Sequence, residues 1–325
     1  MTAAHSAAPP PAWARLDISG MRNGNEDYDI DARTPDVEGL LQRFQSQSES
    51  ARSAPGMVHD SIAYGEHPLA VADLFRPAQG PVRGTVVFVH GGYWKGAGRP
   101  NRAFLAPAWV REGVQWVNVG YPVAPDTPMP RIADYAGGAL RAIMEAQKPF
   151  DRVRGPLVLS GNSAGAHLLA LALASRAPGK KASGGGPGEC APGGAAAGAS
   201  GARQAKEDVA GCMLLSGLYE LEPLLELPSR EWMRLDRETA AGLSPLRLAA
   251  PELRAPVLVT VGADEPEAFL AQSRAYARHL LGHAQVDYQE MAGLNHLTMI
   301  AALESPRAPL GRIVARWLGL ASQAG

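Results

Sequence analysis

A serine between two glycines is the first candidate for chemistry in this sequence. Gly161-Asn162-Ser163-Ala164-Gly165 matches the pattern G-x-S-x-G and stands between a short β-prone run, residues 157–159, and an apolar helix-forming stretch. In that context the pattern predicts a tight strand–turn–helix elbow that presents the Ser163 hydroxyl as a nucleophile. The alternative is a glycine-rich connection with an incidental serine, so a base, an acid and an oxyanion hole must come from elsewhere in the chain.

A pair of glycines supplies the candidate oxyanion hole. Gly91 and Gly92 belong to the segment HGGYW, residues 90–94, which follows a continuous β-branched and aromatic run. Backbone N–H groups of such a loop can face a developing oxyanion, and the Ala164 N–H, at the positive end of the helix behind the serine, is the expected further donor. We expect His90 to be a structural residue of the loop. The alternative is a glycine-rich turn without a catalytic role.

His296 is the candidate base. Of the eight histidines, it is the one that follows the last expected strand, on a loop that opens a short helix. Hydrolases with this kind of elbow place their histidine there, in the chain order Ser…acid…His. The alternative is an ordinary histidine of a surface loop.

Two adjacent carboxylates compete for the place of the acid. Asp264 and Glu265 both follow an expected strand that ends at Gly262. Either could hold the His296 imidazole and stabilise its protonated form. The other would be solvated or would cap the helix that begins near Pro266. The residue types alone leave this choice open.

The candidate residues must be positioned by the strands and helices that alternate along the chain. A hairpin is expected over 57–75, followed by strands at 84–90, 114–119, 157–159, 210–216, 256–261 and 285–290. Helical patterns begin at residues 34–36 and after the elbow, and others cover 102–111, 132–146, 266–281 and 310–318. This order predicts an α/β fold of the α/β-hydrolase kind, with a mostly parallel central sheet, helices on both faces and an antiparallel N-terminal hairpin.

The chain is expected to form a single domain over 15–325 behind a disordered tail, residues 1–14. Residues 178–206 are mostly Gly, Ala, Pro and Ser, with no large apolar side chain, so they predict a mobile insertion within that domain. A linker between domains is the alternative. Cys190 would then be an exposed thiol. The early helix is expected to pack across the body or to cover the site.

Composition excludes several classes of protein. The 325 residues are 46% hydrophobic and 19% charged, with a net charge of -1, which gives no case for a nucleic acid or a membrane surface as partner. Without a membrane-length apolar run or a signal peptide, a cytoplasmic location is the expectation. Cys190 and Cys212 make no disulfide framework, and no Cys/His cluster has metal-ligand spacing. We therefore expect a small-molecule substrate and neither metal nor cofactor, and a homodimer stays open.

Several motifs in order make the chain resemble the kynurenine formamidase (arylformamidase) family of the α/β-hydrolases, which is close to the hormone-sensitive-lipase-like esterases. The matching segments are HGGYW (90–94), GNSAGAHL (161–168), LLSGLYELEPL (214–224), SPLR (244–247), VLVTVGADEPEAFLAQS (257–273) and LNHLTMI (294–300). HGGYW in place of the HGGG of ordinary esterases is distinctive. The resemblance extends from about residue 64 to residue 300, without the insertion.

The resemblance implies hydrolysis of N-formyl-L-kynurenine to L-kynurenine and formate, in tryptophan degradation. Carried over by position, Ser163 is the nucleophile and His296 the base. The family's acid precedes a Phe-x-x-Q-S run by a fixed distance, which here indicates Glu265 rather than Asp264, although family members commonly have aspartate there. Tyr93 and Trp94 could narrow the acyl side and offer a face to the aryl ring. Both rings could equally serve packing.

Two other functions remain open. The first is a short-chain carboxylesterase that uses the same serine, histidine and acid. The second, which is more remote, is a binding protein of the hydrolase fold without catalysis.

Overall fold

The computed structural model describes residues 11–15, 25–96, 98–174 and 209–320, and its centre is an eight-stranded sheet of order β1-β2-β4-β3-β5-β6-β7-β8. β2 runs antiparallel to both of its neighbours, β1 and β4. The remaining neighbours in the sheet, β4-β3-β5-β6-β7-β8, pair in parallel. The predicted α/β fold with its N-terminal antiparallel hairpin is confirmed. The strands are β1 (Met57–Ala63), β2 (Val71–Pro77), β3 (Gly84–Val89), β4 (Val114–Val119), β5 (Leu157–Asn162), β6 (Val209–Leu215), β7 (Val257–Gly262) and β8 (Val286–Met291).

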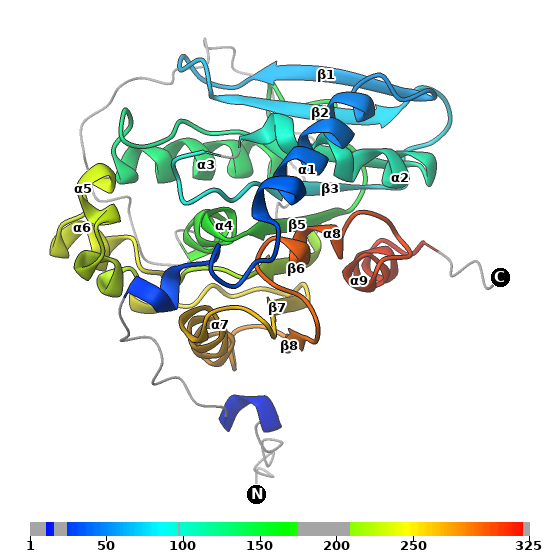
Figure 1. Ribbon diagram of the computed structural model, residues 1–325. Coiled ribbons are helices and arrows are strands. Elements are labelled where there is room, and N and C mark those ends of the chain that lie inside the picture. The colour runs from blue at the N-terminus through cyan, green and yellow to red at the C-terminus, as the bar shows by residue number, and fades with distance from the viewer. Residues whose placement is uncertain (1–10, 16–24, 97, 175–208, 321–325) are drawn as a thin grey trace, which may run out of the picture.

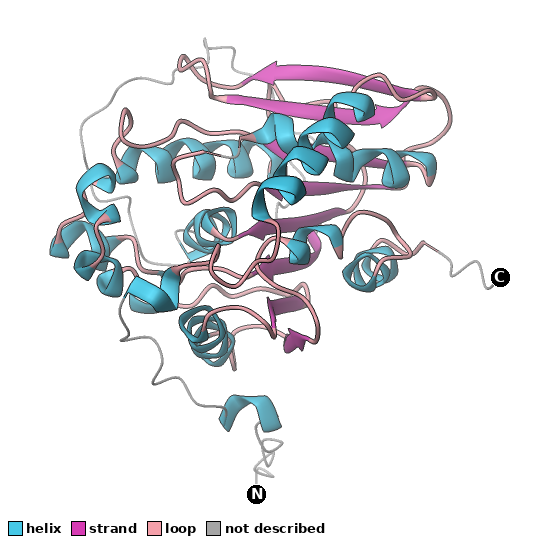
Figure 2. Cartoon of the chain, in the orientation of Figure 1, coloured by secondary structure: helices cyan, strands magenta, loops and turns pink. Residues whose placement is uncertain are grey.

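Helices cover both faces of the sheet, as Figures 1 and 2 show. Successive side chains of a strand point to opposite faces of the sheet. Val87 and Val89 of β3 therefore pack in the core on one face, and Val86 and Phe88 pack in the core on the other. Strands buried on both faces need continuous apolar sequence, which explains the uninterrupted run in β3. The first core contains α3 (Met129–Met144), α4 (Ala164–Ala174) and α7 (Glu267–His279); the second contains α1 (Val37–Ala51), α2 (Ala106–Arg111), α8 (Thr298–Ala301) and α9 (Pro309–Trp317).

The helix expected at 102–111 is divided. Residues Arg99–Leu105 form the 3₁₀ segment η4, and the α-helix α2 starts only at Ala106. Pro107 has no N–H to donate to the carbonyl of Ala103, so a regular α-helix cannot run through this point. Helix α1 begins where expected, with the Asp36 side chain accepting from the Gly39 N–H at 3.1 Å.

Several short elements lie outside the sequence expectations. Between β6 and β7 the chain forms η5 (Glu222–Glu226), α5 (Ser229–Met233), α6 (Arg237–Gly242) and η6 (Pro245–Arg247). In the N-terminal part, η1 (Ala12–Arg15) and η3 (Asn25–Tyr28) precede α1, and Trp13 lies against Tyr288 of β8 with ring centroids 5.9 Å apart. Residues 11–14, assigned to the tail from sequence, thus take part in the fold. The rest of that tail, 1–10, and the insertion at 178–206 with Cys190 lie outside the described residues.

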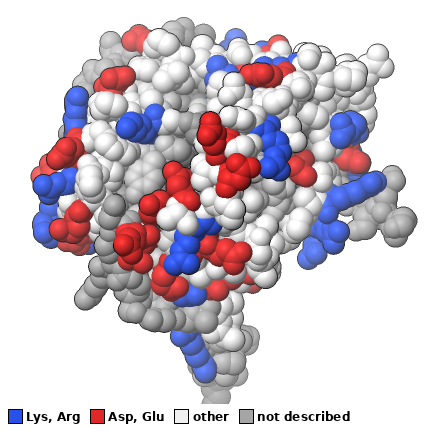
Figure 3. Space-filling model, viewed as in Figure 1, with Lys and Arg blue, Asp and Glu red and all other residues white. Residues whose placement is uncertain are grey.

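The carboxyl ends of β3, β5, β6, β7 and β8 meet at one edge of the sheet because these strands are parallel neighbours. The loops that follow them therefore gather the candidate residues. In the described ranges no helix is long and apolar enough to cross a membrane. On the face drawn in Figure 3, Lys and Arg side chains lie among Asp and Glu side chains.

Candidate active site

Ser163 occupies a strained turn between β5 and α4. Its φ of 56° lies in the left-handed region, and its N–H donates to the Leu215 carbonyl of β6 at 2.8 Å. The Ser163 carbonyl accepts from the His167 N–H at 3.1 Å, which starts the first turn of α4. A non-glycine residue in this region costs on the order of 1–3 kcal/mol and persists only where its surroundings fix it. The predicted elbow is therefore present as a backbone conformation.

The glycines of the elbow let it approach the neighbouring strand and loop. A Cβ on Gly165 would collide with the carbonyl oxygens of Val89 and His90, so α4 begins directly against the end of β3. A Cβ on Gly91 would lie 2.9 Å from the Cβ of Ser163. The loop after β3 and the serine are thus in contact, as an oxyanion hole requires.

The loop after β3 has an unusual backbone. Gly92, Tyr93 and Trp94 have φ values of 110°, 54° and 56°, three consecutive residues with positive φ. His90 is buried, its Nδ1–H donates to the Gly91 carbonyl at 2.7 Å, and its ring stacks on Tyr121 at 4.2 Å. Burial lowers the pKa of His90 to about 3, so its imidazole is neutral at physiological pH. These contacts fit the structural role expected of His90.

Glu265, and not Asp264, contacts His296. Its Oε2 accepts from Nδ1–H of His296 at 2.6 Å, and both side chains are buried. Its Oε1 accepts from the Gly262 N–H at 2.7 Å and from the Ser216 hydroxyl at 2.5 Å. Asp264 is exposed. Because Nδ1 carries the proton in this pair, Nε2 is the nitrogen that can accept one from a nucleophile.

His296 also packs against a residue of α7. The ring of Phe269 lies 4.6 Å from the imidazole, at an interplanar angle of 59°. Among the described residues the Ser163 hydroxyl makes no hydrogen bond to the imidazole; in hydrolases this bond often tightens only in the complex with substrate. The structure thus joins the candidate base directly to the candidate acid and places Ser163 at the same edge of the sheet.

The two aromatic residues after Gly92 differ in position. Trp94 is completely buried, and its Nε1–H donates to Nδ1 of His167 at 3.2 Å, which fits packing rather than contact with a substrate. Tyr93 is half-buried and lies edge-on to Trp232 of α5, with ring centroids 6.0 Å apart. The ammonium group of Lys95 lies 5.1 Å from the centre of the Trp232 ring.

Trp232 and Ser216 also belong to this region, although their residue types and positions predict no role there. Trp232 lies in a short helix that gave no periodic pattern, so its place could not be predicted. Ser216 lies in the segment LLSGLYELEPL, where the Ser-Gly pair directly after an apolar run was a signal of a second tight turn. No group of three or more His, Cys, Asp or Glu side chains in the described ranges could hold a metal ion.

Comparisons with known proteins find curated relatives and solved structures that are similar to this chain. Two curated relatives are kynurenine formamidases: that of Danio rerio is 26% identical over 87% of this chain and 89% of its own length, and that of Salmo salar is 24% identical over 80% and 81%. The resemblance stated from sequence is thus confirmed.

Solved structures show the same fold. A thioesterase candidate from Silicibacter sp. tm1040 superposes with a TM-score of 0.72 at 24% identity, covering 90% of this chain and 98% of its own. An esterase from the bacterial hormone-sensitive lipase family gives a TM-score of 0.54 at 18% identity, covering 87% and 97%. A family model described as the α/β hydrolase fold matches residues 86–300. Because that match spans more than half of the sequence, the chain belongs to the α/β-hydrolase fold family.

Proposed function

We propose that this protein is a serine hydrolase that cleaves an aryl formamide, N-formyl-L-kynurenine, to L-kynurenine and formate, in tryptophan degradation. The observation that carries the proposal is the buried hydrogen bond between Glu265 and His296, at the sheet edge where Ser163 holds its left-handed turn. The similarity to two kynurenine formamidases over most of the chain supports the choice of substrate.

The reaction begins at the serine. His296 Nε2 takes the proton of the Ser163 hydroxyl, and Oγ attacks the formyl carbon. The charge that develops on the formyl oxygen is stabilised by the N–H groups of Gly91, Gly92 and Ala164, each worth about 3 kcal/mol in the transition state. Glu265 stabilises the imidazolium that forms.

Breakdown of the tetrahedral intermediate releases the aryl amine. The imidazolium gives its proton to the aniline nitrogen as the C–N bond breaks, which matters because an anilide is a poor leaving group. A formyl group remains on Ser163. Water, deprotonated by His296, then attacks that ester, and formate leaves as the serine regains its proton.

The surroundings of the serine suit a small acyl group and an aromatic leaving group. The close approach of Gly91 to Ser163 leaves little room beside the nucleophile, and a formyl group needs little. Tyr93 and Trp232 offer half-buried aromatic faces near the loop, and the Lys95 ammonium is a cation that an amino-acid carboxylate could meet. We assign these three residues to the aryl and amino-acid portion of the substrate.

A short-chain carboxylesterase would use the same serine, histidine and acid. The two functions separate when kcat/KM is measured for N-formyl-L-kynurenine and for p-nitrophenyl acetate on the same preparation. The proposal predicts a higher value for the formamide, although the ester is chemically the easier substrate. A preference for the ester by orders of magnitude would overturn the formamidase assignment and leave the esterase.

A further inference from the structure

Ser216 is the residue that directly follows β6, and it is completely buried. Its hydroxyl donates to Oε1 of Glu265 at 2.5 Å, whereas His296 contacts the other carboxylate oxygen, Oε2. No step of the proposed reaction uses this hydroxyl directly. A buried hydroxyl on the carboxylate that holds the base nevertheless acts on the atoms that set the base's orientation.

The backbone of Ser216 is in a conformation that serine rarely adopts. Its φ is 51°, in the left-handed region, where glycine would be free of strain. Its N–H donates to the Thr260 carbonyl of β7 at 2.8 Å. A Cβ on the next residue, Gly217, would collide with the ring of Tyr219, which in turn stacks on Tyr276 at 4.1 Å. The side chain of Ser216 is thus kept where the backbone alone would favour glycine.

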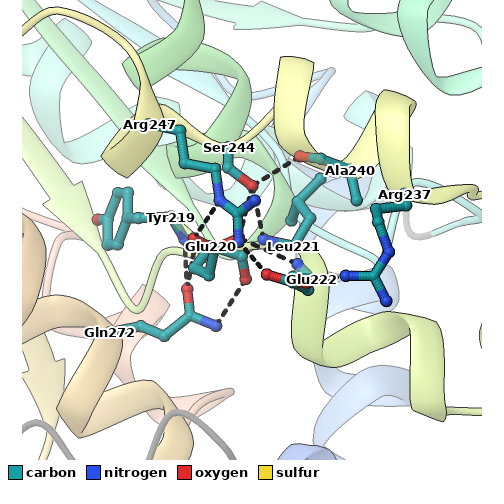
Figure 4. A network of polar contacts seen from close by, with 9 residues as sticks. All are labelled: Tyr219, Glu220, Leu221, Glu222, Arg237, Ala240, Ser244, Arg247 and Gln272. Carbon is teal, nitrogen blue, oxygen red and sulfur yellow. Dashed lines mark hydrogen bonds and ion pairs between the residues drawn. The ribbon is translucent and has the colours of Figure 1, made fainter.

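The segment after Ser216 is fixed by a network of polar contacts, shown in Figure 4. Oε1 of Gln272 accepts from the N–H groups of Tyr219 and Glu220 at 2.5 and 2.8 Å, and its Nε2 donates to the Glu220 carbonyl at 3.0 Å. The Glu220 carboxylate pairs with Arg247 at 2.8 Å and accepts from the Ser244 hydroxyl at 3.0 Å. A strained residue persists where its surroundings fix it. This network holds the segment that follows Ser216, while the Ser216 N–H and hydroxyl are held by Thr260 and Glu265.

A glutamate needs more support than an aspartate in this place. Its side chain has one rotatable bond more, so its carboxylate has more orientations to lose when it meets the imidazole. Two donors on Oε1, the Ser216 hydroxyl and the Gly262 N–H, leave Oε2 as the atom that faces His296.

We propose that Ser216 is a positioning residue, whose hydroxyl fixes the rotation of the Glu265 carboxylate so that Oε2 receives Nδ1–H of His296. This inference rests on the proposed function for the role of Glu265. The serine of the LLSGLYELEPL segment would then affect the reaction only through the orientation of the Glu265 carboxylate.

Two substitutions separate the hydroxyl from the backbone. Ser216→Ala removes the hydroxyl, and Ser216→Gly removes it while relieving the positive φ, so the glycine variant stays folded if the alanine variant does not. We expect both to lower kcat by about tenfold to a hundredfold, the loss of one hydrogen bond to a charged group, with KM within about twofold. The probes are p-nitrophenyl acetate and N-formyl-L-kynurenine. Ser160→Ala is the matched control, because that buried serine of β5 has an unpartnered hydroxyl in the described structure; we expect it to keep kcat within about twofold.

A double-mutant cycle tests whether Ser216 acts through Glu265. In the Glu265→Gln background, adding Ser216→Ala should change kcat by less than about twofold, since the carboxylate is already lost. Wild-type kcat in Ser216→Gly, or the same fold loss in both backgrounds, would overturn the inference. Full activity of Ser216→Ala beside an inactive Glu265→Gln would overturn this inference alone. Full activity of Glu265→Gln would overturn both this inference and the proposed triad. If the wild-type enzyme hydrolyses only p-nitrophenyl acetate and not N-formyl-L-kynurenine, the proposed substrate is wrong, and the cycle is measured with the ester.

Discussion

The Oε2 atom of Glu265 lies 2.6 Å from Nδ1 of His296, and neither side chain is appreciably exposed. Asp264, its neighbour in the chain, is exposed, and its N–H donates to the Leu294 carbonyl at 3.1 Å. Adjacent residues in the turn after β7 thus point in different directions, one toward solvent and one toward the imidazole. A buried carboxylate on Nδ1 also fixes the tautomer that leaves Nε2 able to take a proton.

The pair of carboxylates gives the first prediction. Glu265→Gln should lower kcat by about a thousandfold to ten-thousandfold, because the amide can no longer stabilise the imidazolium or select the correct tautomer. Asp264→Asn is the matched control, with the same chemical change one residue away, and should stay within about twofold of wild type. The measurement is kcat with N-formyl-L-kynurenine at saturation. A large loss of kcat in Asp264→Asn together with nearly wild-type kcat in Glu265→Gln would contradict this prediction and identify Asp264 as the acid.

The positions of Ser163, of the loop after β3 and of the loop that carries His296 follow from the sequence because each comes after a segment that the sequence predicts as a strand, at 157–159, 84–90 and 285–290. Strands of a parallel sheet end at one edge, so the strand order alone brings these loops together. The choice between Asp264 and Glu265 depends on the path of a single turn, which residue types do not determine. The burial of Trp94 depends on successive left-handed residues, which a Tyr-Trp pair does not suggest.

The elements between β6 and β7 could not be predicted for a different reason. α5 and α6 have five and six residues, too few to show a helical period. Their place is set by contacts distant in sequence, such as the pairing of Glu222 with Arg237 and Arg247. Ser216 was visible as a residue of a shared motif, but its partner is 49 residues away.

The close packing of the elbow gives the second prediction. Gly165→Ala places a Cβ against the carbonyl oxygens of Val89 and His90, backbone atoms that cannot move without displacing β3. We expect a destabilisation of more than about 3 kcal/mol in urea unfolding, with loss of activity.

Gly138→Ala is the control for that substitution. Gly138 lies inside α3, and a Cβ there has open space. The alanine should be neutral or should stabilise the fold by about 0.5–1 kcal/mol, because it restricts the unfolded chain and favours the helix. Equal effects of the two variants would contradict the packing described for the elbow.

Two buried histidines give the third prediction, on stability against pH. Burial lowers the pKa of His90 to about 3 and that of His167 to about 4, from an ordinary value of 6.5. Between about pH 4 and pH 6.5 the unfolded chain therefore binds protons that the folded state does not. Their contribution to stability is complete above pH 6.5 and is lost as the pH falls.

The slope of this dependence is the measurement. Each histidine should remove up to about 1.4 kcal/mol of unfolding free energy per pH unit near pH 5, as followed by urea unfolding between pH 7 and pH 5. His167→Gln should reduce the slope by one histidine's share, because its amide can still donate to the Leu243 carbonyl that His167 Nε2 now contacts at 2.8 Å. An unfolding free energy equal at pH 7 and pH 5 would contradict the neutral, buried state of both rings.

The fourth prediction concerns the nucleophile. The proposed function is tested most directly by measuring the release of L-kynurenine from N-formyl-L-kynurenine by wild type and by Ser163→Ala. The alanine keeps the loop, the base and the acid but removes the atom that takes the formyl group. We expect wild type to release L-kynurenine and formate in equal amounts, and Ser163→Ala to be slower by about a millionfold in kcat, as when the nucleophile of a serine hydrolase is removed. No release by wild type, or equal rates in the two proteins, would contradict the proposal.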